Sequence, residues 1–217
     1  MARIKVYTEA TAKKAFACAL DWPGWARPAK TEELAVETLA SYAPRYAPVA
    51  AAAGLRWPAT LDFEVVERLK GSGSTDFGAL DKPPKADAAK ITALAARRQA
   101  SLLQASWDLF DEVVANAPPA LRKGPRGGGR DRDKIVEHVL SAEASYARML
   151  GIKNDPKTSD LSPSAVAHRR VQVIRLLSAT SDGTPPVEKG WPMRYAVRRF
   201  AWHVLDHAWE IEDKSDT

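Results

Sequence analysis

The pattern of the chain changes at Pro83-Pro84, and this change constrains the fold more than any other feature. Before it, short runs of alternating apolar and polar residues surround one helical segment. After it, amphipathic segments of helical length follow one another, separated by proline- and glycine-rich connections. The 217 residues therefore predict an α+β protein with a small module over residues 1–82 and a helical domain over residues 83–217.

The first module contains signals for strands and for one helix. Period-two alternation in residues 4–9 and 15–20 predicts a β-hairpin. A threonine N-cap followed by two glutamates predicts a helix over residues 31–53, kinked or split by its two prolines. Residues 61–65 alternate again and predict another strand, and the Gly-Ser-Gly-Ser run at 71–74 predicts a flexible loop.

Two short sequences in this module carry a family resemblance: Trp-Pro-Gly-Trp at residues 22–25 and Thr-Glu-Glu-Leu at residues 31–34. With them the stretch resembles the HicB-type antitoxin domain, a small hairpin-plus-helix module. The resemblance implies a module that binds a protein partner or nucleic acid. In antitoxins a DNA-binding segment typically follows, whereas here a helical domain follows. The two tryptophans are interpreted either as a binding surface or as a local core.

The second part contains helical segments over residues 86–116, 133–150, 162–180 and 192–212. Their lengths predict an antiparallel four-helix bundle. Apolar residues lie around several faces of the last segment, so we expect that helix to be largely buried.

The net charge is +5 and the pI is 9.3, which is mildly basic. Basic residues concentrate at 122–134, without the dense lysine and arginine stripe that a dedicated nucleic-acid binder needs, so a nucleic-acid partner is not expected. Cys18 is the only cysteine, which excludes an intrachain disulfide. No apolar run is long enough for a bilayer and no signal peptide precedes the first strand, so we predict a cytoplasmic protein without membrane contact.

The strongest chemical signal is a pair of histidines in the last helical segment. His203 and His207 are four residues apart, which places both imidazoles on one helix face, one turn apart. His138 lies near the start of another amphipathic segment. Three imidazoles from two helices would hold a metal ion with open positions, as reactive sites do. Zinc, nickel and ferrous iron all accept such ligands.

Two acidic residues accompany the histidine pair. Glu210 follows His207 by three residues and shares its face, as a partner for a ligating ring or a fourth ligand. Asp206 follows His203 by three residues and is expected to orient that ring. Both are our candidates for a catalytic role, orienting a ligand or moving protons.

Two familiar metal patterns are absent from the sequence. A zincin has H-E-x-x-H, but Val204 stands at the glutamate position. A di-iron bundle repeats Glu-x-x-His, which none of the three histidines shows. A mononuclear site remains, against the alternative that the histidines are solvated or bonded to neighbouring carboxylates. His168, in a polar stretch, is expected at the surface.

The segments at residues 135–143 and 199–210 resemble the DinB/YfiT-like superfamily, which has one histidine on the second bundle helix and H-x-x-x-H on the fourth. His138, His203 and His207 match that pattern position by position, and the resemblance extends from residue 84 onward. It implies that these residues bind one divalent ion. It also implies a thiol-dependent transferase or isomerase, or a metal-dependent hydrolase.

A glycine-rich loop at residues 124–130 precedes the second helical segment. Glycine backbone and arginines at a helix N-terminus suit an anion, although the G-K-[ST] end of a P-loop is missing. Arg126 and Arg130 are therefore candidates for gripping a carboxylate or a thiol cofactor beside the metal. The alternative is a flexible, solvated loop.

These observations give two functional hypotheses. The first is a metal-dependent transferase or hydrolase for a small-molecule substrate, with a low-molecular-weight thiol as a possible cofactor because no cysteine of the chain is near. The second is a non-catalytic regulatory protein whose HicB-like module binds protein or nucleic acid. The substrate, the native metal and the presence of a homodimer are left open.

Overall fold

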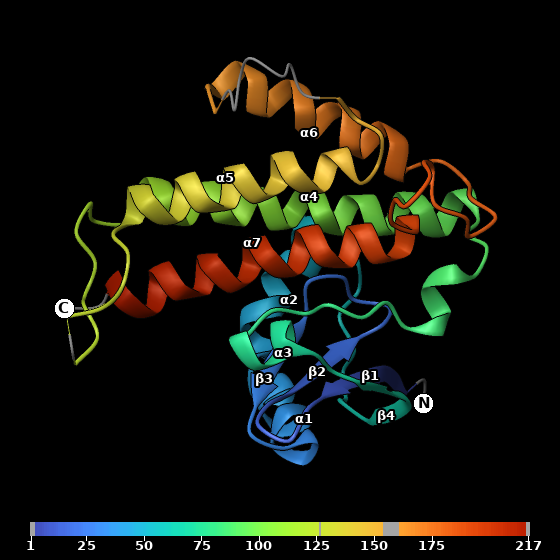
Figure 1. Ribbon diagram of the computed structural model, residues 1–217, viewed down its shortest axis with the longest axis horizontal. Coiled ribbons are helices and arrows are strands. Elements are labelled where there is room, and N and C mark those ends of the chain that lie inside the picture. Colours follow the sequence, from blue (N-terminus) through green and yellow to red (C-terminus); the bar gives the residue numbers. More distant parts are fainter. Residues whose placement is uncertain (1–2, 126, 154–160, 216–217) are drawn as a thin grey trace.

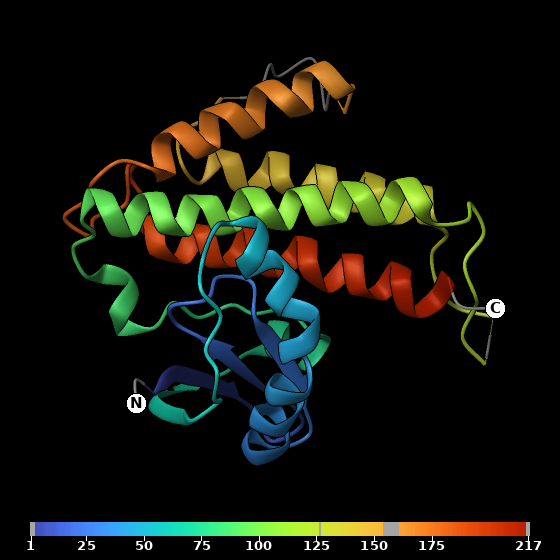
Figure 2. The same ribbon diagram turned by 180° about the vertical axis from the view of Figure 1, so that it is seen from behind.

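A computed structural model describes the chain over residues 3–125, 127–153 and 161–215. The fold is mixed α+β (Figure 1). A sheet with two covering helices lies on one side of an array of long helices, and the view from behind shows the same separation (Figure 2). None of the described helices combines the length and low charge needed to cross a membrane.

The described residues form one four-stranded sheet in the order β3-β2-β1-β4. Its strands are β1 (Ile4–Ala10), β2 (Ala15–Ala19), β3 (Ala26–Ala29) and β4 (Phe63–Lys70). Strands β1 and β2 pair in antiparallel, which confirms the hairpin predicted from the alternation at the start of the chain. Strand β4 pairs with β1 in parallel, so the chain must cross over between them. Strand β3 was not expected, because its Ala-Arg-Pro-Ala sequence lacks clear alternation and its proline suits only an edge.

Helices α1 (Glu32–Ser41) and α2 (Ala43–Ala52) provide this crossover. The hydroxyl oxygen of Thr31 accepts a hydrogen bond from the Leu34 backbone N–H and caps α1. Tyr42 separates the two helices, and a proline occupies the first turn of α2, where its missing N–H costs little. The expected split is therefore confirmed next to Pro44, whereas Pro48 lies inside α2.

An aromatic core lies between this crossover and the sheet. Trp25 is fully buried, stacks on Tyr46 at 5.6 Å between ring centroids, and donates from its indole nitrogen to the Leu39 carbonyl at 2.9 Å. Trp57 lies 5.0 Å from both Trp22 and Trp25 by ring centroids. Trp22 and Trp25 thus belong to a core rather than to an exposed binding surface.

The segment between the sheet and the long helices differs from the sequence expectations. The run predicted as a flexible loop leads into α3 (Gly73–Phe77), because Ser72 and Thr75 exchange the two hydrogen bonds of a capping box. Residues 85–88 form the 3-10 helix η1 (Lys85–Ala88) rather than the start of a long helix. That helix begins later, where Thr92 accepts a hydrogen bond from the backbone of Ala95.

Four long helices complete the chain: α4 (Ala93–Asn116), α5 (Arg132–Arg148), α6 (Pro163–Leu177) and α7 (Met193–Ser215). Helices α4 and α7 run in the same direction, and α5 and α6 run opposite to both (Figure 1). An antiparallel four-helix bundle was expected, but the neighbouring helices α5 and α6 run parallel to each other.

Helix α7 is central, since it packs against α4 and α5 and also against the sheet side of the molecule. Its Trp202 meets Phe16 of β2 edge to face, with 6.0 Å between ring centroids. Its Arg198 donates to the Leu20 carbonyl at 2.6 Å and pairs with the buried Asp87. The expectation of a largely buried last helix is confirmed, and one hydrophobic core is shared by the sheet and the helices.

Candidate metal centre

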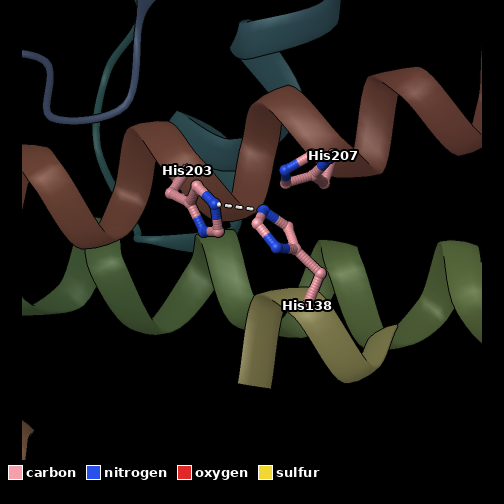
Figure 3. Close-up of side chains that lie close together, drawn as sticks. All are labelled: His138, His203 and His207. Atoms are coloured by element: carbon pink, nitrogen blue, oxygen red, sulfur yellow. Dashed lines mark hydrogen bonds between the residues drawn. The ribbon is translucent and has the colours of Figure 1, made fainter. Parts of the chain in front are cut away.

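Three histidines come together between α5 and α7. His138 points from α5 toward α7, and His203 and His207 point from successive turns of α7 toward it (Figure 3). One ring nitrogen of each lies within 4.8 Å of the others. The spacing of four residues places two rings on one face of α7, and only the packing of α5 brings the third to it.

The spacing of the nitrogens suits a metal ion. His138 Nε2 and His203 Nε2 are 3.2 Å apart. In a tetrahedral zinc site two ligand nitrogens lie about 3.3 Å apart, because each Zn–N bond is about 2.0–2.1 Å. The ring centroid of His207 lies 4.9 Å from that of His138 and 4.7 Å from that of His203. The donor set is all imidazole, so Zn, Ni or Fe fits it better than Mg or Ca.

Burial favours the neutral form of His138 and His203. His203 is 7 % exposed, and burial followed by the neighbouring His207 and His138 holds its pKa well below the usual value. Burial also lowers the pKa of the half-buried His138, with His207 and Arg130 adding to the effect. Neutral imidazoles are the form that binds a metal. His138 and His207 are partly exposed, so the site is accessible from solvent.

Glu210 holds His207 in a ligating orientation. Its Oε2 lies 2.7 Å from His207 Nδ1, and its Oε1 accepts a hydrogen bond from Lys214 Nζ at 2.5 Å. The hydrogen bond with His207, the largest influence, lowers the pKa of Glu210 to about 2. The carboxylate therefore fixes the proton of His207 on Nδ1 and leaves Nε2 as the ligand atom. Sequence spacing had placed Glu210 as such a partner.

Asp206 does not contact the cluster. Its carboxylate accepts a hydrogen bond from Arg27 of β3 at 2.8 Å, which joins the sheet to α7. His203 Nδ1 is buried and has no hydrogen-bond partner among the described residues. The expected orientation of His203 by Asp206 is therefore wrong, because Asp206 lies on the side of α7 that faces the sheet.

The arginines expected beside the metal are only partly described. Arg126 lies outside the described residues. Arg130 is exposed in the loop before α5, yet its charge acts on His138 and His203. Glu143 is buried on α5 and forms an ion pair with Arg170 of α6 at 3.2 Å.

Two neighbours of the cluster were missed from the sequence. The ring centroid of Tyr146 on α5 lies 5.6 Å from that of His203. The guanidinium of Arg199, one turn before His203 on α7, lies 5.4 Å from the Tyr146 ring centroid and 4.8 Å from that of Trp202. Arg199 precedes His203 by four residues, and this helical spacing could have predicted from the sequence that the two side chains share a face of α7.

The remaining candidate groups lie away from this centre. His168 is exposed on α6, as expected for a surface residue. Cys18 is buried in β2, where burial raises its pKa, so its thiol is not available as a nucleophile.

No family model, no curated protein and no solved structure matches the chain.

Proposed function

We propose that this protein binds one divalent metal ion through His138, His203 and His207, on a DinB-like four-helix bundle formed by α4–α7. The observation that carries the proposal is the convergence of these three rings from two helices, with Glu210 bonded to His207. In this bundle α4 and α7 run in one direction, and α5 and α6 run in the opposite direction. The HicB-like assignment of the hairpin and α1 is part of the same proposal.

Three protein ligands suit a reactive site, because a structural zinc site normally closes its fourth position with the protein. A bound ion would polarise a substrate carbonyl or activate a nucleophile in the open position. His203 supplies a buried ligand whose lowered pKa favours the neutral imidazole, and Glu210 fixes the tautomer of His207. The proposed activity is therefore a metal-dependent transfer or hydrolysis on a small molecule.

The surroundings of the site constrain the nucleophile. Cys18 lies in the sheet, so the chain brings no thiol to the histidines. A thiol transferase would thus use a low-molecular-weight thiol from solution, and a hydrolase would use water. Arg130 and Arg199 place positive charge near the rings, which favours a substrate or thiol with an anionic group.

Metal analysis of the purified protein tests this proposal. We expect one zinc, nickel or iron per chain in the wild type and none in a His203→Ala/His207→Ala variant. His168→Ala, which removes an exposed histidine from α6, should keep full metal content. Equal metal content in the wild type and the double variant would refute the site. Thiol-adduct formation and ester hydrolysis, each assayed with the metal-loaded protein, then separate the two reactions.

A second candidate is a metal-responsive regulator without catalysis. The observation that favours it is the direct contact of the sheet with α7, through Phe16 and Trp202 and through Arg27 and Asp206. Through this contact a change at the histidines could reach the HicB-like module. Metal-dependent binding of nucleic acid with a steep salt dependence, and no turnover of either substrate class, would select this function.

A further inference from the structure

A second cavity lies where the sheet meets the first turns of two helices. It measures about 360 Å³ and is separate from the histidines. One wall consists of Ala95, Arg98 and Gln99, which share a face of α4 at i, i+3 and i+4 spacing. Arg194, in the first turn of α7, provides a second wall. The sheet side and its loops complete the lining with Arg3, Ile4, Asp21, Trp22 and Pro58.

The lining carries an excess of positive charge. Arg98 donates to the backbone carbonyl of Asp21, and Arg194 donates to the carbonyls of Ala89 and Lys90. Within residues 3–125, 127–153 and 161–215, neither guanidinium forms an ion pair with a carboxylate. Arg3 pairs with Asp62, and the exposed Asp21 is the one acidic group in the lining.

The guanidiniums are held in place by backbone and ring contacts. Arg98 lies over the Trp22 ring, with 4.6 Å between its Cζ and the ring centroid. A stacked guanidinium keeps a fixed plane and retains donors for a second partner. The backbone carbonyls that hold Arg194 likewise leave its charge without a counter-ion. Both cations are therefore oriented before any ligand arrives, which reduces the ordering needed for binding.

Gln99 provides a side-chain amide whose hydrogen bonding is incomplete. It is 4 % exposed, lines the cavity, and its amide oxygen is buried without a hydrogen-bond partner among the described residues. A buried amide oxygen without a partner is costly, so a ligand group that completes its hydrogen bonding would be favoured. Rotation of the amide presents either its oxygen or its NH2 to that ligand.

We propose that this cavity binds a small organic acid, with its carboxylate between Arg98 and Arg194 and its apolar body against Trp22, Ile4 and Pro58. The volume is at the lower end of the range for ligand pockets, about 300–1,000 Å³, which suits one ring or a short chain. Guanidiniums match a carboxylate through paired hydrogen bonds. The apolar lining favours an organic acid over a bare inorganic anion. This site goes beyond the proposed metal function.

Calorimetric titration of the full-length protein with benzoate tests the site. Metal is first removed with a chelator and the chelator is then dialysed away, so that the histidines cannot bind the probe through a metal and failure here does not bear on the metal proposal. Benzoate should bind, while benzamide, which has the same shape without the charge, and inorganic phosphate, which has no apolar body, should bind about tenfold more weakly or not at all.

Variants assign the binding to this cavity. Arg98→Gln and Arg194→Gln should each weaken benzoate binding about tenfold. Arg97→Gln, which removes an exposed charge from the same helix, is the matched control and should bind as the wild type does. Ala95→Leu fills the cavity without changing a charge, and it should abolish binding even if the arginine variants unfold.

Four results would overturn the proposal. The first is no benzoate binding at millimolar concentration. The second is a benzoate affinity that benzamide or phosphate equals. The third is a loss in Arg97→Gln as large as that in Arg98→Gln. The fourth is unchanged binding in Ala95→Leu.

Discussion

The aromatic core beside the sheet and the histidine cluster beside α5 pack their rings at the same spacing. Ring centroids are 5.0 Å apart for Trp25 and Trp57 and 5.0 Å apart for His138 and His203. The chemistry differs. The indole N–H of Trp25 has a carbonyl partner, whereas the two imidazoles face each other through nitrogen atoms and His203 Nδ1 has no partner among the described residues. Between these two clusters, the spacing of the rings is therefore the same and the hydrogen bonding of their nitrogen atoms differs.

This difference predicts opposite responses to substitution. The aromatic core stabilises the fold by removing apolar surface from water. The histidine cluster holds polar nitrogens in a partly dry site, so without a metal ion it contributes little or opposes folding. Changes in the core should therefore alter the free energy of unfolding, and changes in the cluster should alter metal affinity.

The largest effect is expected at Trp25. Trp25→Ala removes a fully buried ring and should lower the free energy of unfolding by about 3–5 kcal/mol, because a cavity remains. Urea unfolding of the full chain measures it. Phe77→Ala, at a position 89 % exposed, should change stability by less than about 0.5 kcal/mol. A loss at Trp25 no greater than that at Phe77 would remove the assignment of a stabilising core.

Metal addition should stabilise the protein through the histidine cluster. At a free metal concentration of about a hundredfold over Kd, the free energy of unfolding should rise by about 2.7 kcal/mol, because the ion binds the folded state. Thermal unfolding with and without zinc measures the rise. The His203→Ala/His207→Ala variant should show none, and a rise of the same size there would place the ion elsewhere.

Glu210→Gln removes the charge of the carboxylate that contacts the His207 ring. It should weaken metal binding by about 10- to 100-fold, since the carboxylate that fixes His207 is lost. Competition with a metal-sensitive dye measures the affinity. The matched control is Glu137→Gln, which removes an exposed carboxylate next to His138 and should leave the affinity unchanged.

The smallest effect is expected at Asp206. Asp206→Asn breaks its ion pair with Arg27 and should lower the free energy of unfolding by about 1 kcal/mol, because the pair is partly exposed. Metal affinity should stay at the wild-type value, since Asp206 does not touch a histidine. A large loss of metal affinity with unchanged stability would show that Asp206 acts at the site after all.

Local patterns in the sequence identified most of the regular structure. The alternation of the first hairpin, the threonine cap of α1 and the long amphipathic helices depend on neighbours within a few residues, so they can be found in the chain itself. Strand β3 and helix α3 were missed for two different reasons. The pairing of β3 with β2 is set by the sheet, and the capping box of α3 uses Ser and Thr that also suit a loop.

The sequence alone identified two of the three candidate metal ligands, because His203 and His207 share a face on any helix. Tertiary structure decided the rest. Only the packing of α5 on α7 brings His138 within reach, and only the docking of the sheet turns Asp206 toward Arg27 instead of toward a ring. Helical periodicity fixes which side chains share a face, but the partner of each face depends on contacts between segments far apart in the chain.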